Sequence, residues 1–332
     1  MAAKGLRLGP HLAPLAPLAP RIAILNGVQV GTANHNTGYA QYARLKTHVQ
    51  AEMPQILDII GRHRDTQAVG VIDGDWIGSS FSSRDGASDG LLPSLESSSA
   101  DECGIMSATL RKQARALGPG SRATVTAYEE TAALLERLPK VPTFREEAWS
   151  SEVEAQHVAR LLQRARWVFQ NDLARCFYIM LDMPAPPWDT HTFNTQRQAR
   201  FSGWTMAMLA RFFRSLETTS SAHGPLSETV AVVIGSDVGR FPRLNGWGGK
   251  DHFPEIPLLL YGRAFNTGSG GATYGATDRR MATLPVSLQT GQRETGGHTM
   301  TLDDVGTTML HVAGIASPAA YGYTGKILPF LV

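Results

Sequence analysis

The chain is poor in cysteine, and its cysteines do not form a metal-binding pattern. Cys103 and Cys176 are the only two among 332 residues, and no Cys-x-x-Cys pair occurs. This excludes a structural zinc site built on thiolates. Cys176 lies in the apolar run CFYIML and is predicted to be a small buried hydrophobic side chain. The pattern gives no indication of a disulfide between the two.

Long apolar runs and a strong charge of one sign are also absent. No stretch approaches the roughly 18 apolar residues of a membrane span. The formal net charge is only +2, from 31 basic and 29 acidic residues, which gives no support for nucleic-acid binding. Prolines interrupt the N-terminal segment MAAKGLRLGPHLAPLAPLAPRIAILNG, so we expect no export signal in it as written. We also expect no long regular helix there, and its leucines should dock an extended or kinked segment onto the domain.

Several catalytic motifs are missing as well. The chain has no His-Glu-x-x-His pair and no phosphate loop ending in Gly-Lys-Ser/Thr. It also has no Gly-x-Gly-x-x-Gly after its first apolar run. These absences exclude a zincin protease, a P-loop ATPase and a Rossmann dehydrogenase.

Short apolar runs alternate with helical patterns along the chain. The expected strands are Arg21–Leu25, Ala68–Ile72, Arg175–Leu181, Thr229–Ile234 and, more weakly, Pro257–Tyr261. The expected helices are Gly38–Arg62, Gly104–Leu117, Thr124–Leu138, Phe144–Gln170 and Gln196–Leu216. Because the apolar runs lack polar alternation, they predict strands covered on both faces. The order predicts an α/β fold with a mostly parallel, doubly wound sheet.

The whole chain, residues 1–332, is predicted to form a single domain with one insertion. The insertion is a low-complexity segment rich in Ser, Gly and Asp at about residues 74–102. Such a segment is typical of a surface insertion, and a lid over a site is the alternative interpretation.

Polar side chains of the kinds that bind metals and anions follow the predicted strands. They are Thr32, Asn34, His35 and Thr37 after the first strand, Asp73 and Asp75 after the second, Asp182, Asp189 and His191 after the third, and Asp237, Arg240, Asp251 and His252 after the fourth. Ligands bind beyond the carboxyl ends of strands in open α/β sheets. We therefore expect these side chains to meet at one edge of the sheet.

The mixture of carboxylates and imidazoles predicts a divalent-metal site. Its candidate ligands are Asp189, His191, Asp237 and His252. Zinc binds imidazole nitrogen and carboxylate oxygen, and manganese, iron and calcium are compatible with the same ligand types. Each residue also has an ordinary alternative role, such as a helix N-cap for Asp237 or a polar turn residue for His191.

Further residues are candidates for substrate binding and catalysis. Arg240 and Lys250 place positive charge beside the predicted metals, which suits a phosphate or sulfate oxyanion. Asn34 is a further candidate for substrate binding. The hydroxyls of Thr32 and Thr37 lie where a strand turns into a helix and are candidate nucleophiles. His35 lies between them as a candidate base or further ligand, while Thr37 could equally belong to a helix N-cap.

Two ordered motifs resemble those of the bacterial domain-of-unknown-function 1501 family. The stretch VVIGSDVGRFPRLNGWGGKDHFP at residues 232–254 is similar to the family's acidic residue followed by Phe-Gly-Arg-Thr-Pro and a glycine-rich run into Gly-Arg-Asp-His-Trp. The stretch WDTH at residues 188–191 resembles its Phe/Trp-Asp-Thr-His element. Gly275–Asp278 and the closing helix Asp303–Ala313 also fit. The resemblance covers roughly residues 5–315.

The family is similar to the alkaline phosphatase and sulfatase superfamily, which implies a three-layer α/β/α sandwich around one or two metals. The resemblance implies that Asp189, His191 and His252 bind one metal. It implies that Asp237, in place of the usual glutamate, binds a second. In that superfamily a Ser, Thr or modified Cys at a helix N-terminus attacks the ester, and the metals stabilise the developing charge.

One departure from the family pattern bears on function and location. Relatives usually carry an export signal, followed by a first strand that ends in Gly-Gly-x-Asp, before the region that matches Gly5–Gly27. We expect this chain to lack that strand. The resemblance implies an exported, periplasmic location for relatives, although the chain as given shows no signal.

The sequence therefore predicts a metal-dependent hydrolase that acts on small anionic esters of phosphate or sulfate. Because the first strand is expected to be missing, a non-catalytic binding or assembly protein that keeps the fold is the alternative, and it could be exported. A metal-binding protein without turnover is a third hypothesis. The identity of the substrate and the oligomeric state are not indicated.

Overall fold

The structure is a computed structural model that describes most of the chain. The described residues are 4–50, 53–63, 67, 69–73, 100–117, 121–137, 149, 153–181 and 188–332. The chain divides into two compact units. The first unit comprises Met1–Ile56, Asp182–Thr218 and Pro225–Val332, and the second comprises Leu57–Leu181 and Thr219–Gly224. The single domain over residues 1–332 stays a prediction. Most of the predicted insertion, residues 74–99, lies outside the described residues.

Helices and strands both build the fold, which confirms the predicted α/β class in its general form. The first unit contains a five-stranded sheet in the order β1-β11-β2-β10-β7. The bounds of these strands, in the same order, are Lys4–Gly5, Ala272–Gly275, Ile22–Gln29, Glu255–Tyr261 and Val232–Ile234.

This sheet is mixed, whereas the sequence predicts a mostly parallel one. Strands β11 and β2 pair in parallel, but the β1–β11, β2–β10 and β10–β7 pairs are antiparallel. The expectation was based on apolar runs without polar alternation. Such runs show that a strand is covered on both faces but do not specify the direction of its neighbours.

The pairing brings three chain segments to one edge of the sheet. Strand β10 lies between β2 and β7 and runs antiparallel to both, with Glu255 opposite Gln29 and Leu259 opposite Ile234. The carboxyl ends of β2 and β7 therefore lie at the same edge as the amino end of β10. Residues that follow β2, follow β7 and precede β10 are brought close together by backbone pairing.

The remaining elements of the first unit are helices and one short hairpin. The helices are α1 His35–Arg44, α7 Asn194–Thr218, α8 Leu226–Thr229, α9 Leu302–Val312, η1 Pro10–Arg21 and η4 Pro318–Tyr321. The hairpin pairs β8 Gly239–Arg240 with β9 His252–Phe253 in antiparallel fashion.

The helix expected over Gly38–Arg62 is two helices. Helix α1 ends at Arg44, and its C-cap Leu45 adopts the left-handed conformation with φ of 46°. Helix α2, Ile56–Arg62, begins only after Pro54. A proline inside a helix removes a backbone hydrogen bond and clashes with the preceding turn. The apolar spacing alone did not reveal this break.

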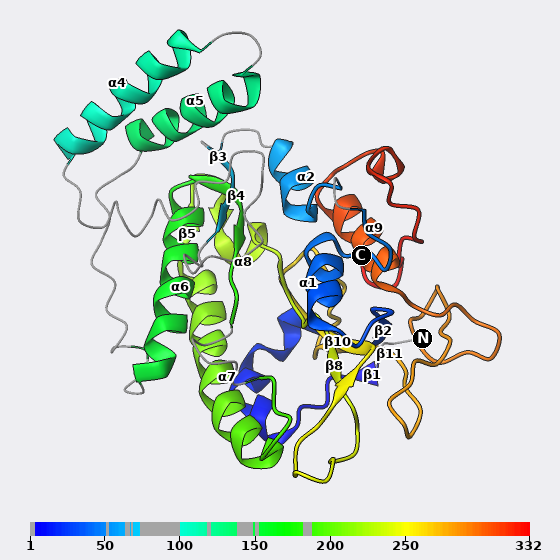
Figure 1. The fold of residues 1–332 in the computed structure, drawn as a ribbon. Helices are drawn as coiled ribbons and strands as arrows, with labels where there is room; N and C mark the ends of the chain where they lie inside the picture. The colour runs from blue at the N-terminus through cyan, green and yellow to red at the C-terminus, as the bar shows by residue number, and fades with distance from the viewer. Residues whose placement is uncertain are drawn as a thin grey trace. The chain divides into compact units, whose positions relative to one another are not determined.

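The N-terminal prolines form a helix of a different kind. Residues Pro10–Arg21 form a 3₁₀ helix that contains Pro14, Pro17 and Pro20. A 3₁₀ helix has 3.0 residues per turn, so a three-residue repeat keeps its leucines on one face. Leu15 and Leu18 are buried, and η1 packs against α7 (Figure 1). The docking of these leucines is as predicted, but the segment is helical rather than extended.

The second unit has its own small sheet and core. Its elements are α2 from Leu57 onward, β3 Val69–Asp73, α4 Ala100–Ala116, α5 Arg122–Arg137, α6 Val153–Gln170, β4 Ala174–Tyr178 and β5 Ser220–Ser221, and β6 Gly224–Pro225 follows at its boundary. Strands β3 and β4 pair in parallel. Ile72, Leu134 and Trp167 belong to the core beside them. Cys103 and Cys176 are buried free thiols, and burial raises the pKa of Cys176 to about 12. This confirms the prediction that Cys176 is a buried side chain.

Among the described helices, none has both the length and the apolar composition required to cross a bilayer.

A buried ion pair joins three segments of the first unit. Lys46 is 6% exposed, and its ammonium donates to Asp303 Oδ1 at 3.2 Å and to the Gly322 carbonyl at 2.5 Å. Asp303 Oδ2 accepts the backbone N–H of Thr47 at 2.8 Å. Burial raises the pKa of Asp303, but the hydrogen bonds from Thr47 and Lys46 outweigh it and hold the pKa below its ordinary value.

The Asp303→Asn variant is expected to lose about 3 kcal/mol of unfolding free energy at pH 7, because Lys46 stays buried without its carboxylate. The folded pKa of Asp303 lies below its unfolded value of about 3.9. Its contribution is therefore complete above that value and is lost as the pH falls through the folded pKa. Denaturant unfolding of variant and wild type should show a smaller difference at pH 3 than at pH 7. If the difference in unfolding free energy were equal at pH 3 and pH 7, the stabilising role assigned to the Asp303 carboxylate would be contradicted.

Candidate metal centre

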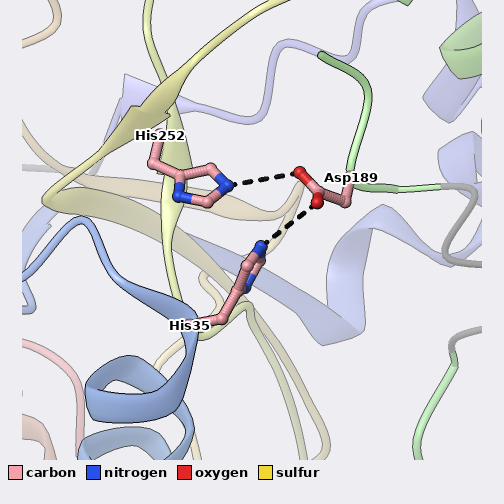
Figure 2. Close-up of side chains that lie close together, drawn as sticks. All are labelled: His35, Asp189 and His252. Atoms are coloured by element: carbon pink, nitrogen blue, oxygen red, sulfur yellow. Dashed lines mark hydrogen bonds and ion pairs between the residues drawn. The ribbon is translucent and has the colours of Figure 1, made fainter.

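Three side chains of the first unit, His35, Asp189 and His252, form a compact group, called here the triad. One ligand atom from each lies within 4.8 Å of the others. His35 Nε2 is 3.5 Å from Asp189 Oδ2, and His252 Nε2 is 3.2 Å from Asp189 Oδ1. Figure 2 shows the carboxylate reaching between the two imidazoles, with His35 at the start of α1 and His252 on the hairpin strand. The structure thus contains one possible metal-binding triad.

The helix start after β2 fixes His35. Asn34 is the N-cap of α1, and its side chain accepts the backbone N–H of Thr37 at 3.2 Å. His35 Nδ1 lies 2.5 Å from Asp237 Oδ2. Because a carboxylate can only accept, Nδ1 carries the proton and Nε2 of the neutral ring carries a lone pair. His35 Nε2 is buried, and it has no hydrogen-bond partner within the described ranges. Buried acceptors without a partner are uncommon in folded proteins, and one that faces a carboxylate is suited to bind a cation.

The second imidazole is arranged in the same way. His252 Nδ1 lies 2.8 Å from the carbonyl oxygen of Ala33. A carbonyl also only accepts, so Nδ1 donates and Nε2 carries the lone pair that faces Asp189. Two nitrogen lone pairs and a carboxylate converge, and they repel one another unless a proton or a cation lies between them. This donor set fits a divalent cation.

Asp189 is kept ionised by its neighbours. Arg240 donates to Asp189 Oδ1, and strand pairing places Arg240 opposite His252. Burial raises the pKa of Asp189, but the hydrogen bond from Arg240 and its positive charge outweigh burial and lower the pKa to about 2. The carboxylate is therefore negative at neutral pH, as a metal ligand must be.

His191 adds a further nitrogen to the group. Its Nε2 is 3.0 Å from His252 Nε2 and 3.1 Å from Asp189 Oδ1, while its Nδ1 is 3.4 Å from Asp251 Oδ1. Again one ring nitrogen faces a carboxylate and the other faces the triad. The side chain is 46% exposed. His191 is therefore a fourth candidate ligand on the more open side of the group.

The charges in direct contact with the imidazoles are mainly negative. Three carboxylates, of Asp189, Asp237 and Asp251, contact these rings, and the guanidinium of Arg240 contacts Asp189. With neutral imidazoles this leaves an excess of negative charge, which attracts a cation.

A close backbone contact holds the two segments that supply Asp189 and His252. Thr192 and Gly248 form an antiparallel bridge, and the Lys250 N–H donates to the Thr190 carbonyl at 2.9 Å. A Cβ added at Gly249 would lie 1.8 Å from the carbonyl oxygen of His191. Glycine is therefore required at this position.

The four predicted metal ligands lie together at one place. Asp189 and His252 belong to the triad, and His191 contacts both. Asp237 reaches the triad through His35 Nδ1. His35, predicted as a base or further ligand, is a triad member. Its position in the polar segment after the first strand was the available signal. Its pairing with Asp237 could not be predicted without the fold.

The other predicted site residues make local contacts. Thr32 Oγ1 accepts the Asn34 N–H at 3.2 Å, and Asn34 caps Thr37. The Lys250 carbonyl accepts from Arg240 Nη1 at 3.2 Å, and Arg240 itself is bound to Asp189. The nucleophile role of either threonine stays a prediction, as do the anion-binding roles of Asn34, Lys250 and Arg240.

Comparison with known proteins gives one match. The model of the family "Protein of unknown function (DUF1501)" matches residues 121–327. This match is well over half of the chain, and it includes Asp189, Asp237 and His252 but not His35. No curated protein and no solved structure matches the chain. The chain belongs to the DUF1501 family, whose function is unknown.

Proposed function

We propose that this protein is a metal-dependent hydrolase of phosphate or sulfate esters with an alkaline phosphatase-like, three-layer arrangement. The observation that carries the proposal is the orientation of the triad. Two imidazoles have Nδ1 engaged by an acceptor, and their Nε2 atoms face the two oxygens of Asp189. Zinc is the preferred ion because the donors are nitrogen and carboxylate oxygen.

Each side chain has a defined task in this proposal. His35, Asp189 and His252 hold the ion, Asp237 orients His35, and the Ala33 carbonyl orients His252. When bound, zinc supplies Lewis acidity and lowers the pKa of a coordinated water. The Arg240 guanidinium, in contact with Asp189, favours an anionic substrate over a neutral one.

We assign Asp237 as a positioning residue rather than as the ligand of a second metal. Its Oδ2 is taken by His35 Nδ1 at 2.5 Å, and its Oδ1 accepts from Ser236 Oγ at 3.2 Å. A carboxylate that orients a metal-binding imidazole in this way raises its basicity and fixes its tautomer. One ion per chain is therefore expected.

The Asp237→Asn variant is expected to bind zinc about 10–100-fold more weakly than the wild type. Asp237→Glu should recover part of the affinity because it restores the acceptor. Competition with a chromogenic chelator measures both affinity and stoichiometry. Asp278→Asn is the matched control, since Asp278 caps the turn at Arg280 and Ala282. Two ions in the wild type and one in Asp237→Asn would show instead that Asp237 binds a second metal.

The hydrolase proposal is tested by turnover of the zinc-loaded protein. We expect hydrolysis of 4-nitrophenyl phosphate or 4-nitrophenyl sulfate that a chelator abolishes and zinc restores. Loss of turnover in Thr32→Ala or Thr37→Ala would identify the nucleophile. Tight zinc binding without turnover on either ester would overturn the hydrolase proposal.

One observation favours a second candidate, a structural metal site without turnover. His191 Nε2 lies close enough to Asp189 and His252 to complete a four-ligand set, and closed four-coordinate sites are typical of structural zinc. In that case His191→Ala should weaken zinc binding as strongly as loss of a triad imidazole. If His191→Ala leaves zinc affinity nearly unchanged, the fourth coordination position of the zinc is open to substrate. That result would favour the hydrolase proposal.

A further inference from the structure

The hairpin that carries Arg240 and His252 ends in a loop with exposed apolar side chains. In this loop Phe241 is 43% exposed, Leu244 53% and Trp247 78%. Phe193, in the segment that pairs with the loop, is 63% exposed. These four residues are called here the aromatic rim. Among the described residues, all the large hydrophobic side chains that are both exposed and aromatic belong to this rim.

The rim is continuous with the metal centre along the backbone. The Thr192–Gly248 bridge is antiparallel, so Phe193 and Trp247 take opposing positions beside it. Phe193 is two residues from His191. Phe241 directly follows Arg240, and its ring lies edge-to-face on Phe253 with centroids 5.7 Å apart. Phe253 in turn directly follows His252. The rim therefore lies along the same two segments that position the triad.

One side chain holds the loop in shape. Asn245 Oδ1 accepts the backbone N–H groups of Trp247 at 3.0 Å and Gly249 at 2.9 Å. Its Nδ2 donates to the His191 carbonyl at 3.1 Å and to Asp251 Oδ1 at 3.0 Å. The backbone that presents Trp247 is thus fixed to the segment of the metal centre. A ring on a fixed backbone loses little conformational freedom when a ligand stacks on it.

The backbone at Phe193 is strained. Its φ of 51° lies in the left-handed region, where a bulky side chain is uncommon. Strain of this kind persists only where the surrounding structure imposes it, and it concentrates at ligand sites. Here the Asn194 N–H bond to the Gly248 carbonyl, at 2.9 Å, holds the turn in place. Phe193, two residues from His191, is therefore both strained in its backbone and exposed in its side chain.

We propose that the aromatic rim is a substrate subsite that binds the aryl group of a phosphate or sulfate ester whose anionic end lies at the metal centre. This inference rests on the hydrolase proposal. The four rim side chains carry one polar atom, the indole N–H of Trp247, so they offer little to a substrate rich in hydroxyl groups. Flat apolar rings instead favour stacking with another ring.

Binding of two non-hydrolysable probes to the zinc-loaded protein tests the subsite. By calorimetry, Trp247→Ala should weaken phenylphosphonate binding about tenfold and leave methylphosphonate binding unchanged. Trp247→Phe should restore most of the difference because it keeps a ring. Met281→Ala is the matched control, since Met281 is also an exposed apolar side chain, 49% exposed, but lies on another loop.

Turnover assays separate failure of the subsite from failure of the hydrolase proposal. The Trp247→Ala variant should raise KM for phenyl phosphate but not for ethyl phosphate. If the protein hydrolysed both esters and Trp247→Ala changed KM equally for the two, only the subsite proposal would be overturned. Ring-selective phosphonate binding without any turnover would overturn the hydrolase alone. If the protein bound neither phosphonate, both the subsite proposal and the hydrolase proposal would be overturned. If Trp247→Ala changed the oligomeric state but not the phenylphosphonate affinity, the rim would instead bind a second copy of the chain.

Discussion

Replacement of Asp189 by asparagine is expected to abolish detectable zinc binding. Asp189 is the carboxylate of the triad, and it presents Oδ2 toward His35 and Oδ1 toward His252. Asparagine keeps the shape of the side chain but removes its charge and one of its two oxygens. Loss of a direct ligand should weaken zinc binding by more than the roughly 100-fold that is the upper limit for loss of a residue that only orients a ligand. Chelator competition at neutral pH measures the change.

The control for this experiment is a neighbouring carboxylate. Asp251 contacts His191 but neither triad imidazole, and its side chain is 62% exposed. We expect Asp251→Asn to change zinc affinity far less than Asp189→Asn. Because Asp189→Asn also removes the partner of Arg240, circular dichroism should confirm that the variant is folded. A folded Asp189→Asn protein that binds zinc as tightly as the wild type would overturn the metal proposal, and the hydrolase proposal with it.

The sequence located the main strands of both units but not their directions. The run at Arg21–Leu25 overlaps the first half of β2, and the run at Pro257–Tyr261 lies within β10. These neighbours are antiparallel, and their composition could not show it because both are covered strands. The very short strands β1 and β8 were not predicted, since two residues give no periodicity.

The candidate ligands were easier to predict than their partners. Asp237 and His252 were recognisable because they lie at the two ends of the connection after the fourth predicted strand, where polar side chains at the sheet edge are informative. The pairing of Asp237 with His35 was not predictable, because 202 residues separate them. That pairing depends on β10 lying between β2 and β7, which places both carboxyl ends at one edge.

Arg240 illustrates a second limit of sequence reasoning. A guanidinium in this position can bind either a protein carboxylate or a substrate anion. The residue type alone does not show which of the two it binds. In the structure it donates to Asp189, because hairpin pairing places it opposite His252. Its effect on the pKa of Asp189 is a contribution to the centre that the sequence did not indicate.

The Gly249→Ala variant should disrupt the centre without touching a ligand. The added Cβ would lie 1.8 Å from the His191 carbonyl oxygen and 2.4 Å from the Thr192 N, so one of the two segments must move. Overpacking of this kind costs about 3 kcal/mol of unfolding free energy at the upper end of its usual range. One segment carries Asp189 and His191 and the other carries His252, so zinc affinity should fall together with stability whichever segment moves.

Gly246 offers a matched control three residues earlier in the same loop. A Cβ added there would meet nothing within 4 Å, so Gly246→Ala should keep both zinc affinity and stability, or gain slightly from a less flexible unfolded chain. Thermal unfolding with and without zinc, with chelator competition, compares the two variants. If Gly249→Ala kept the zinc affinity of Gly246→Ala, the close contact between the two segments would not be what holds Asp189 against His252, and the centre would have to be held by the hairpin alone.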